Sequence, residues 1–91
     1  MGFIWETPEE IDLAIARRLR GIRKRKHLTQ RQLSEKSNVS FGSVKRFEGT
    51  GQISLISLTK LAAALDCMED LKRLFADVKY LSIEEVIRER P

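Results

Sequence analysis

Basic side chains gather in one stretch of the chain. Between Arg17 and Arg46 the sequence holds 11 Lys and Arg residues but only one acid, Glu35, which gives a local charge of +10. The remaining residues hold 6 basic and 12 acidic side chains, a charge of −6, so that the whole chain carries +4. A charge run is usually a solvated surface, but this one adds like-charge repulsion without helping the chain to fold. The asymmetry therefore indicates a partner rich in phosphate.

Other reactive side chains are too few for catalysis or metal binding. Cys67 is the only cysteine and His27 the only histidine, so neither an intrachain disulfide nor a Cys/His metal site is expected. Cys67 lies in an apolar context, which favours a packing role. Neither a Gly-x-Ser-x-Gly elbow nor a phosphate-binding loop occurs. We expect no catalytic residue, no metal, no cofactor and no enzymatic activity.

The length and hydropathy of the chain limit its class. Ninety-one residues make one domain, which we take to span residues 1–91. The amino terminus lacks the pattern of a secretory signal, and no apolar run approaches the roughly 18–20 residues that cross a bilayer. We therefore expect a cytoplasmic protein without a membrane partner.

Capping motifs and apolar spacing predict helices almost throughout. Thr7-Pro8-Glu9-Glu10 is an N-terminal capping box that opens a helix ending near Lys26–His27. Thr29 and Gln32 form a second capping box, and Asn38 suits a left-handed turn at the end of that helix. The apolar stripe of the first helix consists of Ile11, Ile15, Leu19 and Ile22.

The second half of the chain continues this pattern. Ser40 caps a third helix, residues 41–48, which buries Val44 and Phe47 and is broken by Gly49-Thr50-Gly51. Two more helices follow, one capped by Ser54 and one from about Met68 to Phe75 that buries Leu71 and Phe75, and a last short helix is expected at 83–89. The inner face of the fourth helix is expected to be Leu55, Leu58, Leu61, Ala62 and Leu65.

Two short helices joined by a three- or four-residue turn form a helix-turn-helix. Here the pattern is Leu28-Thr29-Gln30, then Leu33, Asn38-Val39-Ser40, Val44 and Phe47-Glu48-Gly49. It resembles the Cro/phage-repressor (XRE-like) helix-turn-helix family over residues 11–75. Ser34 and Asn38 replace the usual small residue and turn glycine of the family, and both fit those positions. The resemblance implies an all-α, compact five-helix lambda-repressor-like domain with a core at 7–75, a helix pair at 29–48 and a C-terminal extension with a short helix at 76–91.

The resemblance and the helical geometry together assign residue roles on double-stranded DNA. Arg46 matches a family position that faces base edges, and its guanidinium can pair with O6 and N7 of guanine. Phe41 is expected either to pack on a thymine methyl or to be a core aromatic, and Gly42 would allow close approach of the backbone. The expected base contacts are Phe41, Gly42, Ser43 and Arg46, and the expected phosphate contacts are Gln30, Arg31, Ser40 and Lys45.

Arg23 and Glu48 match a family pair that ties the first helix to the end of the recognition helix. We expect a partly buried ion pair between them. The alternative is two unrelated surface charges.

The resemblance implies a sequence-specific transcriptional regulator, a repressor that binds DNA as a homodimer in a bacterial cytoplasm, at the nucleoid. Phe3-Ile4-Trp5 and residues 83–87 are the two candidate dimer interfaces. The stretch from Glu48 to Leu55, with residues 65–75 and a Ser-Ile-Glu-Glu-Val tail, also looks like the antitoxin-type regulators encoded beside HipA-like kinase toxins. Such a protein would bind both its operator and its toxin. A third possibility is a protein-interaction module that keeps the fold without binding DNA.

Overall fold

Capping side chains set where the helices begin. In the computed structural model, which describes residues 6–77, α1 (Pro8–Arg25) starts after Thr7 and α2 (Gln30–Ser37) after Thr29. Both caps are capping boxes, as predicted: the Thr7 hydroxyl accepts from the Glu10 N–H, and the Thr29 hydroxyl accepts from the Gln32 N–H. Ser40 and Ser54 cap α3 (Phe41–Thr50) and α4 (Leu55–Ala64), and α5 (Met68–Lys72) follows.

Left-handed residues end the two helices that form the helix-turn-helix. Asn38 ends α2 at φ 61°, which confirms the predicted turn. Gly51 ends α3 at φ 84°, and its N–H donates to the Phe47 carbonyl over 2.7 Å. Gly49 and Thr50 were expected to break the chain but lie inside α3, so the expectation was wrong for those two residues. Only Gly51 supplies the positive φ that stops the helix.

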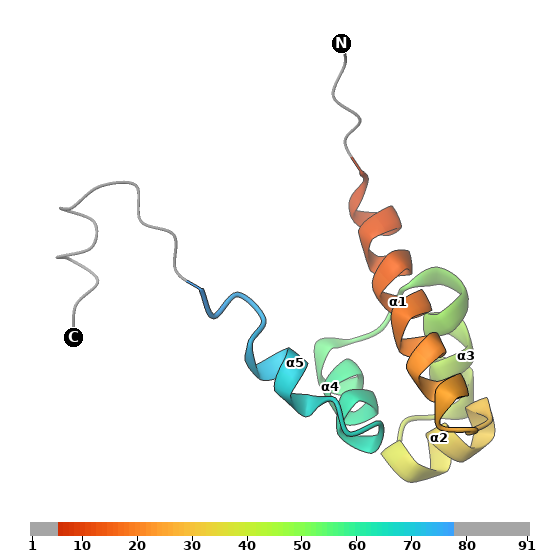
Figure 1. Ribbon diagram of the computed structural model, residues 1–91. Helices are drawn as coiled ribbons and strands as arrows, with labels where there is room; N and C mark the ends of the chain where they lie inside the picture. The colour runs from red at the N-terminus through yellow and green to blue at the C-terminus, as the bar shows by residue number, and fades with distance from the viewer. Residues whose placement is uncertain (1–5, 78–91) are drawn as a thin grey trace, which may run out of the picture.

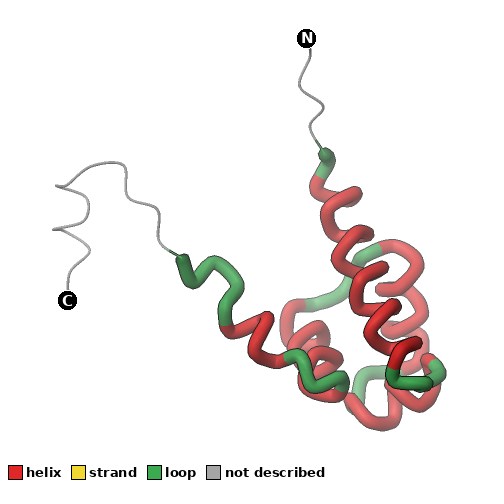
Figure 2. The backbone as a smooth tube through the Cα atoms, in the orientation of Figure 1, coloured by secondary structure: helices red, strands yellow, loops and turns green. Residues whose placement is uncertain are grey.

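Figure 1 shows α1 lying alongside α3, with α2 at one end of the pair and α4 and α5 continuing to the other side. Figure 2 shows the helices joined by short loops, without a strand in the described residues. These features confirm the all-α, five-helix prediction. Helix α1 contributes Ala16 to the core, α2 contributes Leu33, and Val39 enters from the turn between α2 and α3. The other buried apolar residues are Val44, Phe47, Leu61, Ala62, Ala64 and Leu65.

Several expected core residues lie outside this core. Leu55 is 67% exposed because it stands at the first position of α4, while the packing of this helix begins about one turn later, at Leu58. Phe75 is 92% exposed, since α5 ends at Lys72 and the left-handed φ of 58° at Phe75 breaks the i, i+4 spacing from Leu71. Leu71 is half-buried, and Ile11 and Ile15 on α1 are exposed.

The sequence predictions for Phe3-Ile4-Trp5 and for a helix at 83–89 lie outside the described residues. Within residues 6–77, no helix combines the length and apolar character that crossing a membrane requires.

Candidate nucleic-acid interface

The turn between α2 and α3 is fixed by side-chain hydrogen bonds to the backbone. The Ser34 hydroxyl donates to the Val39 carbonyl over 2.6 Å, and the Val39 N–H donates to the Ser37 hydroxyl over 3.2 Å. Ser34 is therefore not only small enough for its position but also stabilises the turn through its hydroxyl. With Val39 buried beneath them, these bonds hold the start of α3 at a set angle to α2.

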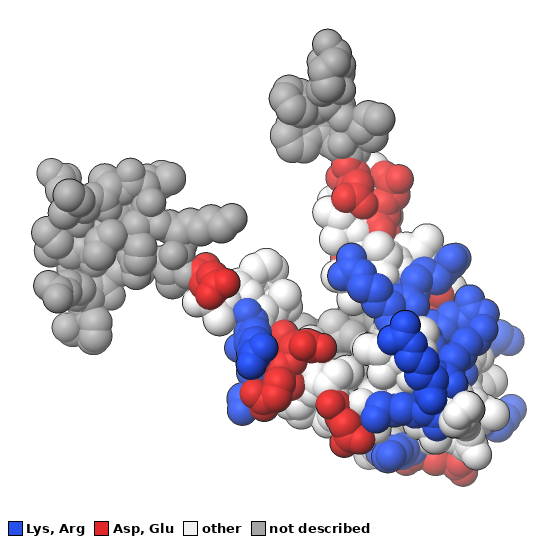
Figure 3. All heavy atoms as spheres, viewed as in Figure 1, with Lys and Arg blue, Asp and Glu red and all other residues white. Residues whose placement is uncertain are grey.

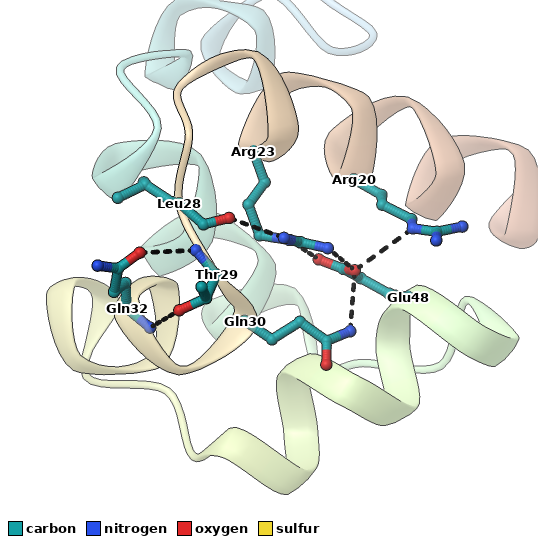
Figure 4. A network of polar contacts seen from close by, with 7 residues as sticks. All are labelled: Arg20, Arg23, Leu28, Thr29, Gln30, Gln32 and Glu48. Atoms are coloured by element: carbon teal, nitrogen blue, oxygen red, sulfur yellow. Dashed lines mark hydrogen bonds and ion pairs between the residues drawn. The ribbon is translucent and has the colours of Figure 1, made fainter.

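A buried ion pair joins α1 to α3, as Figure 4 shows. The Arg23 Nε donates to Glu48 Oε2 over 2.7 Å, and Arg23 Nη2 donates to Glu48 Oε1 over 2.8 Å. Arg23 Nη1 also donates to the Leu28 carbonyl in the loop between α1 and α2, over 2.8 Å. Arg23 and Glu48 are 7% and 5% exposed, so this is a shielded two-pronged contact between elements rather than a pair of separate surface charges.

Two more side chains approach the same carboxylate. Gln30 Nε2 donates to Glu48 Oε1 over 3.0 Å, and Arg20 Nε lies 4.0 Å from that oxygen. Burial alone would raise the pKa of Glu48, but the hydrogen bonds from Arg23 and Gln30 and the charges of Arg23 and Arg20 outweigh it and lower that pKa. Glu48 is therefore held ionised as the centre of a network from α1, α2 and α3.

Gln30 was expected to contact the phosphate backbone. It is half-buried, and one hydrogen of its amide nitrogen is used by Glu48. A primary amide has two donor hydrogens, so the second can still meet a phosphate oxygen. In the first turn of α2 the Gln32 N–H donates to the Thr29 hydroxyl, which leaves the N–H groups of Gln30 and Arg31 to favour an anion.

On α3, Ser40 and Ser43 share one hydrogen-bonded unit. The Ser43 N–H donates to the Ser40 hydroxyl over 3.1 Å, and that hydroxyl donates to Ser43 Oγ over 2.7 Å. The single hydroxyl hydrogen of Ser40 is therefore engaged, which removes its means of bonding a phosphate. Ser43 keeps its own hydrogen and is exposed, as are Gly42 and Lys45.

Phe41 and Arg31 lie against one another. The Arg31 guanidinium carbon lies 4.3 Å from the centroid of the Phe41 ring, a cation–π contact between the starts of α2 and α3. Phe41 is half-buried, so it is neither a fully buried core aromatic nor a free one. The stacking holds Arg31 near the amino-terminal end of α3.

Arg46 is exposed and hydrogen-bonded to Gln52, which is not among the predicted DNA contacts. Its Nη2 donates to Gln52 Oε1 over 2.6 Å. Gln52 follows the helix-ending Gly51, and no local motif in the sequence connects it to Arg46. Only the backbone reversal at Gly51 brings the two side chains together.

A polar hollow of about 500 Å³ lies between α1 and α3. Gly49 forms part of it, and a Cβ added there would meet nothing within 4 Å. Glu48 is the one acid in its lining and is matched by Arg23, so the remaining cations leave the hollow positive. The lining residues are Arg17, Arg20, Arg23, Gln30, Lys45, Glu48 and Gly49.

Figure 3 shows Lys and Arg side chains gathered over the part of the molecule that contains α1, α2 and α3, with acidic side chains over α5 and the start of α1. The charge asymmetry of the sequence is therefore also an asymmetry of the surface. No group of three or more potential metal ligands occurs among residues 6–77. Cys67 is half-buried, and burial raises the pKa of its thiol, which disfavours the reactive thiolate.

A family model described as helix-turn-helix matches residues 19–71 of the chain, the segment that contains the C-terminal part of α1, the whole of α2, α3 and α4, and most of α5. The protein belongs to the Cro/C1-type, XRE-like helix-turn-helix family. It is a DNA-binding helix-turn-helix regulator, and the domain of this family is regulatory rather than catalytic. Neither a curated protein nor a solved structure gave a match.

Proposed function

We propose that the protein is a transcriptional repressor that binds its operator as a homodimer at the bacterial nucleoid, with α3 in the major groove. The observation that carries this proposal is the exposed face of α3, which holds Ser43, Lys45 and Arg46, while Val44 and Phe47 anchor its other face. A helix anchored on one side and polar on the other is the kind of element that enters the major groove.

Base recognition would fall to the exposed residues of α3. Arg46 would donate to O6 and N7 of a guanine, and Ser43 would donate to an acceptor nearby. Phe41 would offer the free part of its ring to a thymine methyl, and Gly42 would let the helix backbone approach the base pairs closely. Few side chains would then contact bases, which leaves a share of the specificity to DNA shape.

Phosphate binding would use the ends of two helices and the hollow between α1 and α3. Gln30 and Arg31 lie at the start of α2, where the free N–H groups favour an anion. Lys45 lines the hollow together with Arg17 and Arg20, which supports a phosphate-binding role for these two residues of α1 as well. Ser40 was an expected phosphate contact, but we omit it because its hydroxyl hydrogen is already donated to Ser43.

Dimer formation is supported by the small number of base contacts that one domain can make. A single recognition helix makes few base contacts, and the usual remedy is a dimer on two half-sites about 34 Å apart. Exposed apolar side chains on α4 and after α5 supply a surface for a second copy of the chain. We define this apolar patch as Leu55, Leu74 and Phe75, which are 67%, 51% and 92% exposed and border one groove with Met68 and Leu71.

The test is binding to duplexes selected from a random pool, followed by fluorescence titration at increasing salt. Wild-type affinity should fall steeply with salt because bound phosphates release counterions. Arg46→Ala should weaken binding to the selected sequence more than to random duplex, whereas Gln30→Ala should weaken both. If wild-type affinity stayed flat with salt, the phosphate contacts would be wrong. If neither substitution changed DNA affinity, the protein would instead be an interaction module that has kept the fold.

A second candidate function adds a protein partner. The antitoxin-type regulators that the sequence resembles bind both DNA and a kinase-like toxin, and the apolar patch could hold such a partner in place of a second copy. Co-purification with the product of an adjacent gene distinguishes the two. A kinase-like partner that protects Phe75 from solvent would favour the antitoxin, and a homodimer alone would favour the plain repressor.

A further inference from the structure

The side chains of Arg46 and Gln52 form one unit at the end of α3. The bond from Arg46 Nη2 to Gln52 Oε1 is 2.6 Å long. A guanidinium has only donors, so the amide oxygen must face it, and the amide nitrogen faces away. Arg46 keeps its other N–H groups for a ligand, while one of its terminal nitrogens is held.

The loop that carries Gln52 is itself fixed to Arg46. The Thr50 hydroxyl donates to the Arg46 carbonyl over 2.7 Å and accepts from the Gln52 N–H over 3.1 Å. Gly51 is buried between them and bonded to Phe47. Gln52 is therefore attached to the last turn of α3 through its backbone as well as its side chain, so its amide oxygen has a set place relative to Arg46.

The side chains of Arg46 and Gln52 border open space rather than packed side chains. An open polar hollow of about 380 Å³ borders both residues. The donors of Arg46 that Gln52 does not use therefore have room to meet the acceptors of a ligand. The lining residues are Ser43, Arg46, Gln52, Ile53, Ser54 and Ser57.

We propose that Gln52 is a positioning residue that orients the Arg46 guanidinium for guanine. This inference rests on the proposed function, since it requires that Arg46 contacts a base. A free arginine on a helix surface samples many rotamers. Fixing its side chain in one rotamer on binding costs entropy, which lowers affinity. A guanidinium held at one nitrogen presents its remaining donors in a fixed direction, which two-pronged contact with O6 and N7 requires.

The experiment compares base preferences selected from a random duplex pool by wild-type protein and four variants. Arg46→Ala should abolish the guanine preference at one base pair of each half-site. Gln52→Ala and Gln52→Asn should each lower that preference about fivefold to tenfold. The first substitution removes the amide oxygen, and the second moves it out of reach of Arg46 because the side chain is shorter. Other base pairs, the salt dependence and the thermal midpoint should stay as in wild type.

Gln52→Glu is the conservative variant. Its carboxylate accepts the same bond from Arg46, so the guanine preference should be retained while affinity for all sequences falls, because a negative charge then lies near the phosphates. The proposal is overturned if Arg46→Ala removes the preference but Gln52→Ala does not, and the function proposed for Arg46 then stands. It is also overturned if Gln52→Ala lowers affinity uniformly together with the thermal midpoint. If Arg46→Ala leaves the base preference unchanged, the proposed contact of Arg46 with guanine is wrong, and the positioning role of Gln52 is wrong with it.

Discussion

At the scale of single residues, Glu48 links α1 and α2 to α3, the proposed recognition helix. Its carboxylate accepts from Arg23 twice and from Gln30 once, with only 5% of the residue exposed. Removing the carboxylate leaves a buried guanidinium without its counter-charge, which costs far more than losing a surface pair. The residue that orients α3 is thus also a main determinant of stability.

We predict that Glu48→Ala lowers the free energy of unfolding by about 3–5 kcal/mol, measured by urea denaturation. The control is Glu69→Ala, which removes an exposed carboxylate paired with Lys72 at 3.3 Å. Exposed pairs of this kind contribute less than about 1 kcal/mol. Equal effects of the two substitutions would contradict a special role for the buried pair.

The same carboxylate predicts how stability depends on pH. The folded-state pKa of Glu48 is lowered: burial raises it, and the bonds and charges of its partners lower it by more. A group of this kind stabilises the fold fully above its unfolded pKa and loses that contribution as the pH falls through the folded pKa. Stability should therefore decline as the pH falls below about 5.

Urea denaturation at several pH values measures this decline, and Glu48→Gln should flatten it. Hydrogen bonds with the Thr7 backbone and side chain lower the pKa of Glu10, which adds to the decline in the same direction. Glu10→Gln should therefore flatten the decline separately. A Glu48→Gln profile as steep as that of wild type would contradict the prediction.

At the scale of elements, Gly51 fixes how α3 meets α1. A Cβ added at its φ of 84° would lie 2.6 Å from the Asp12 carbonyl carbon and from the Leu13 nitrogen, both backbone atoms of α1. Neither atom belongs to a flexible side chain, so the helices would have to separate. Close approach and a left-handed turn both require glycine here.

Gly51→Ala should lower the free energy of unfolding by more than about 1 kcal/mol, since the backbone is strained and α1 must shift. Gly49→Ala is the matched control, because Gly49 lies within α3 and a Cβ there meets nothing within 4 Å. It should stabilise the protein by about 0.5–1 kcal/mol. Thermal or urea unfolding gives both values, and the same sign for both would contradict the assignment of the helix end to Gly51.

The sequence predicts the features that depend on residues close together in the chain, and it does not predict those that depend on tertiary structure. The caps at Thr7 and Thr29 and the turn at Asn38 depend on residues within four positions, so their motifs suffice. The exposure of Leu55 and Phe75 depends on where neighbouring helices end, which apolar spacing does not encode. The contact of Gln52 with Arg46 depends on the backbone path through Gly51 and is likewise not encoded in a motif.

The basic residues of α1 could not be sorted from the sequence, because they surround the helix axis. In the structure, Arg17 and Arg20 line the hollow beside α3, whereas Arg18 borders an apolar groove formed with α4 and α5. Arg17→Ala and Arg20→Ala should each reduce the slope of log affinity against log salt by about 1 on any duplex. Arg18→Ala removes the same charge and should leave the slope unchanged, so three equal slopes would contradict a specific phosphate site.

At the scale of the whole molecule, the main basic surface and the apolar patch lie on different elements. Lys and Arg cover the region of α1, α2 and α3 (Figure 3), whereas the apolar patch lies on α4 and after α5. Figure 1 shows α5 on the opposite side of the molecule from α3. A second copy that bound at the patch would therefore leave both recognition helices uncovered, as two half-sites require.

We predict that Leu55→Ser combined with Phe75→Ser weakens the homodimer at least tenfold in sedimentation experiments, because both side chains lose apolar area that the partner would bury. Affinity for a paired half-site duplex should fall with it, whereas affinity for a single half-site should be unchanged. The control is Ile56→Ser, adjacent to Leu55 and 64% exposed but not part of the groove at the patch. Since all three residues are exposed in the monomer, urea denaturation of dilute protein should show little change. A dimer that survives the double substitution and is lost on Ile56→Ser would move the interface to the other face of α4.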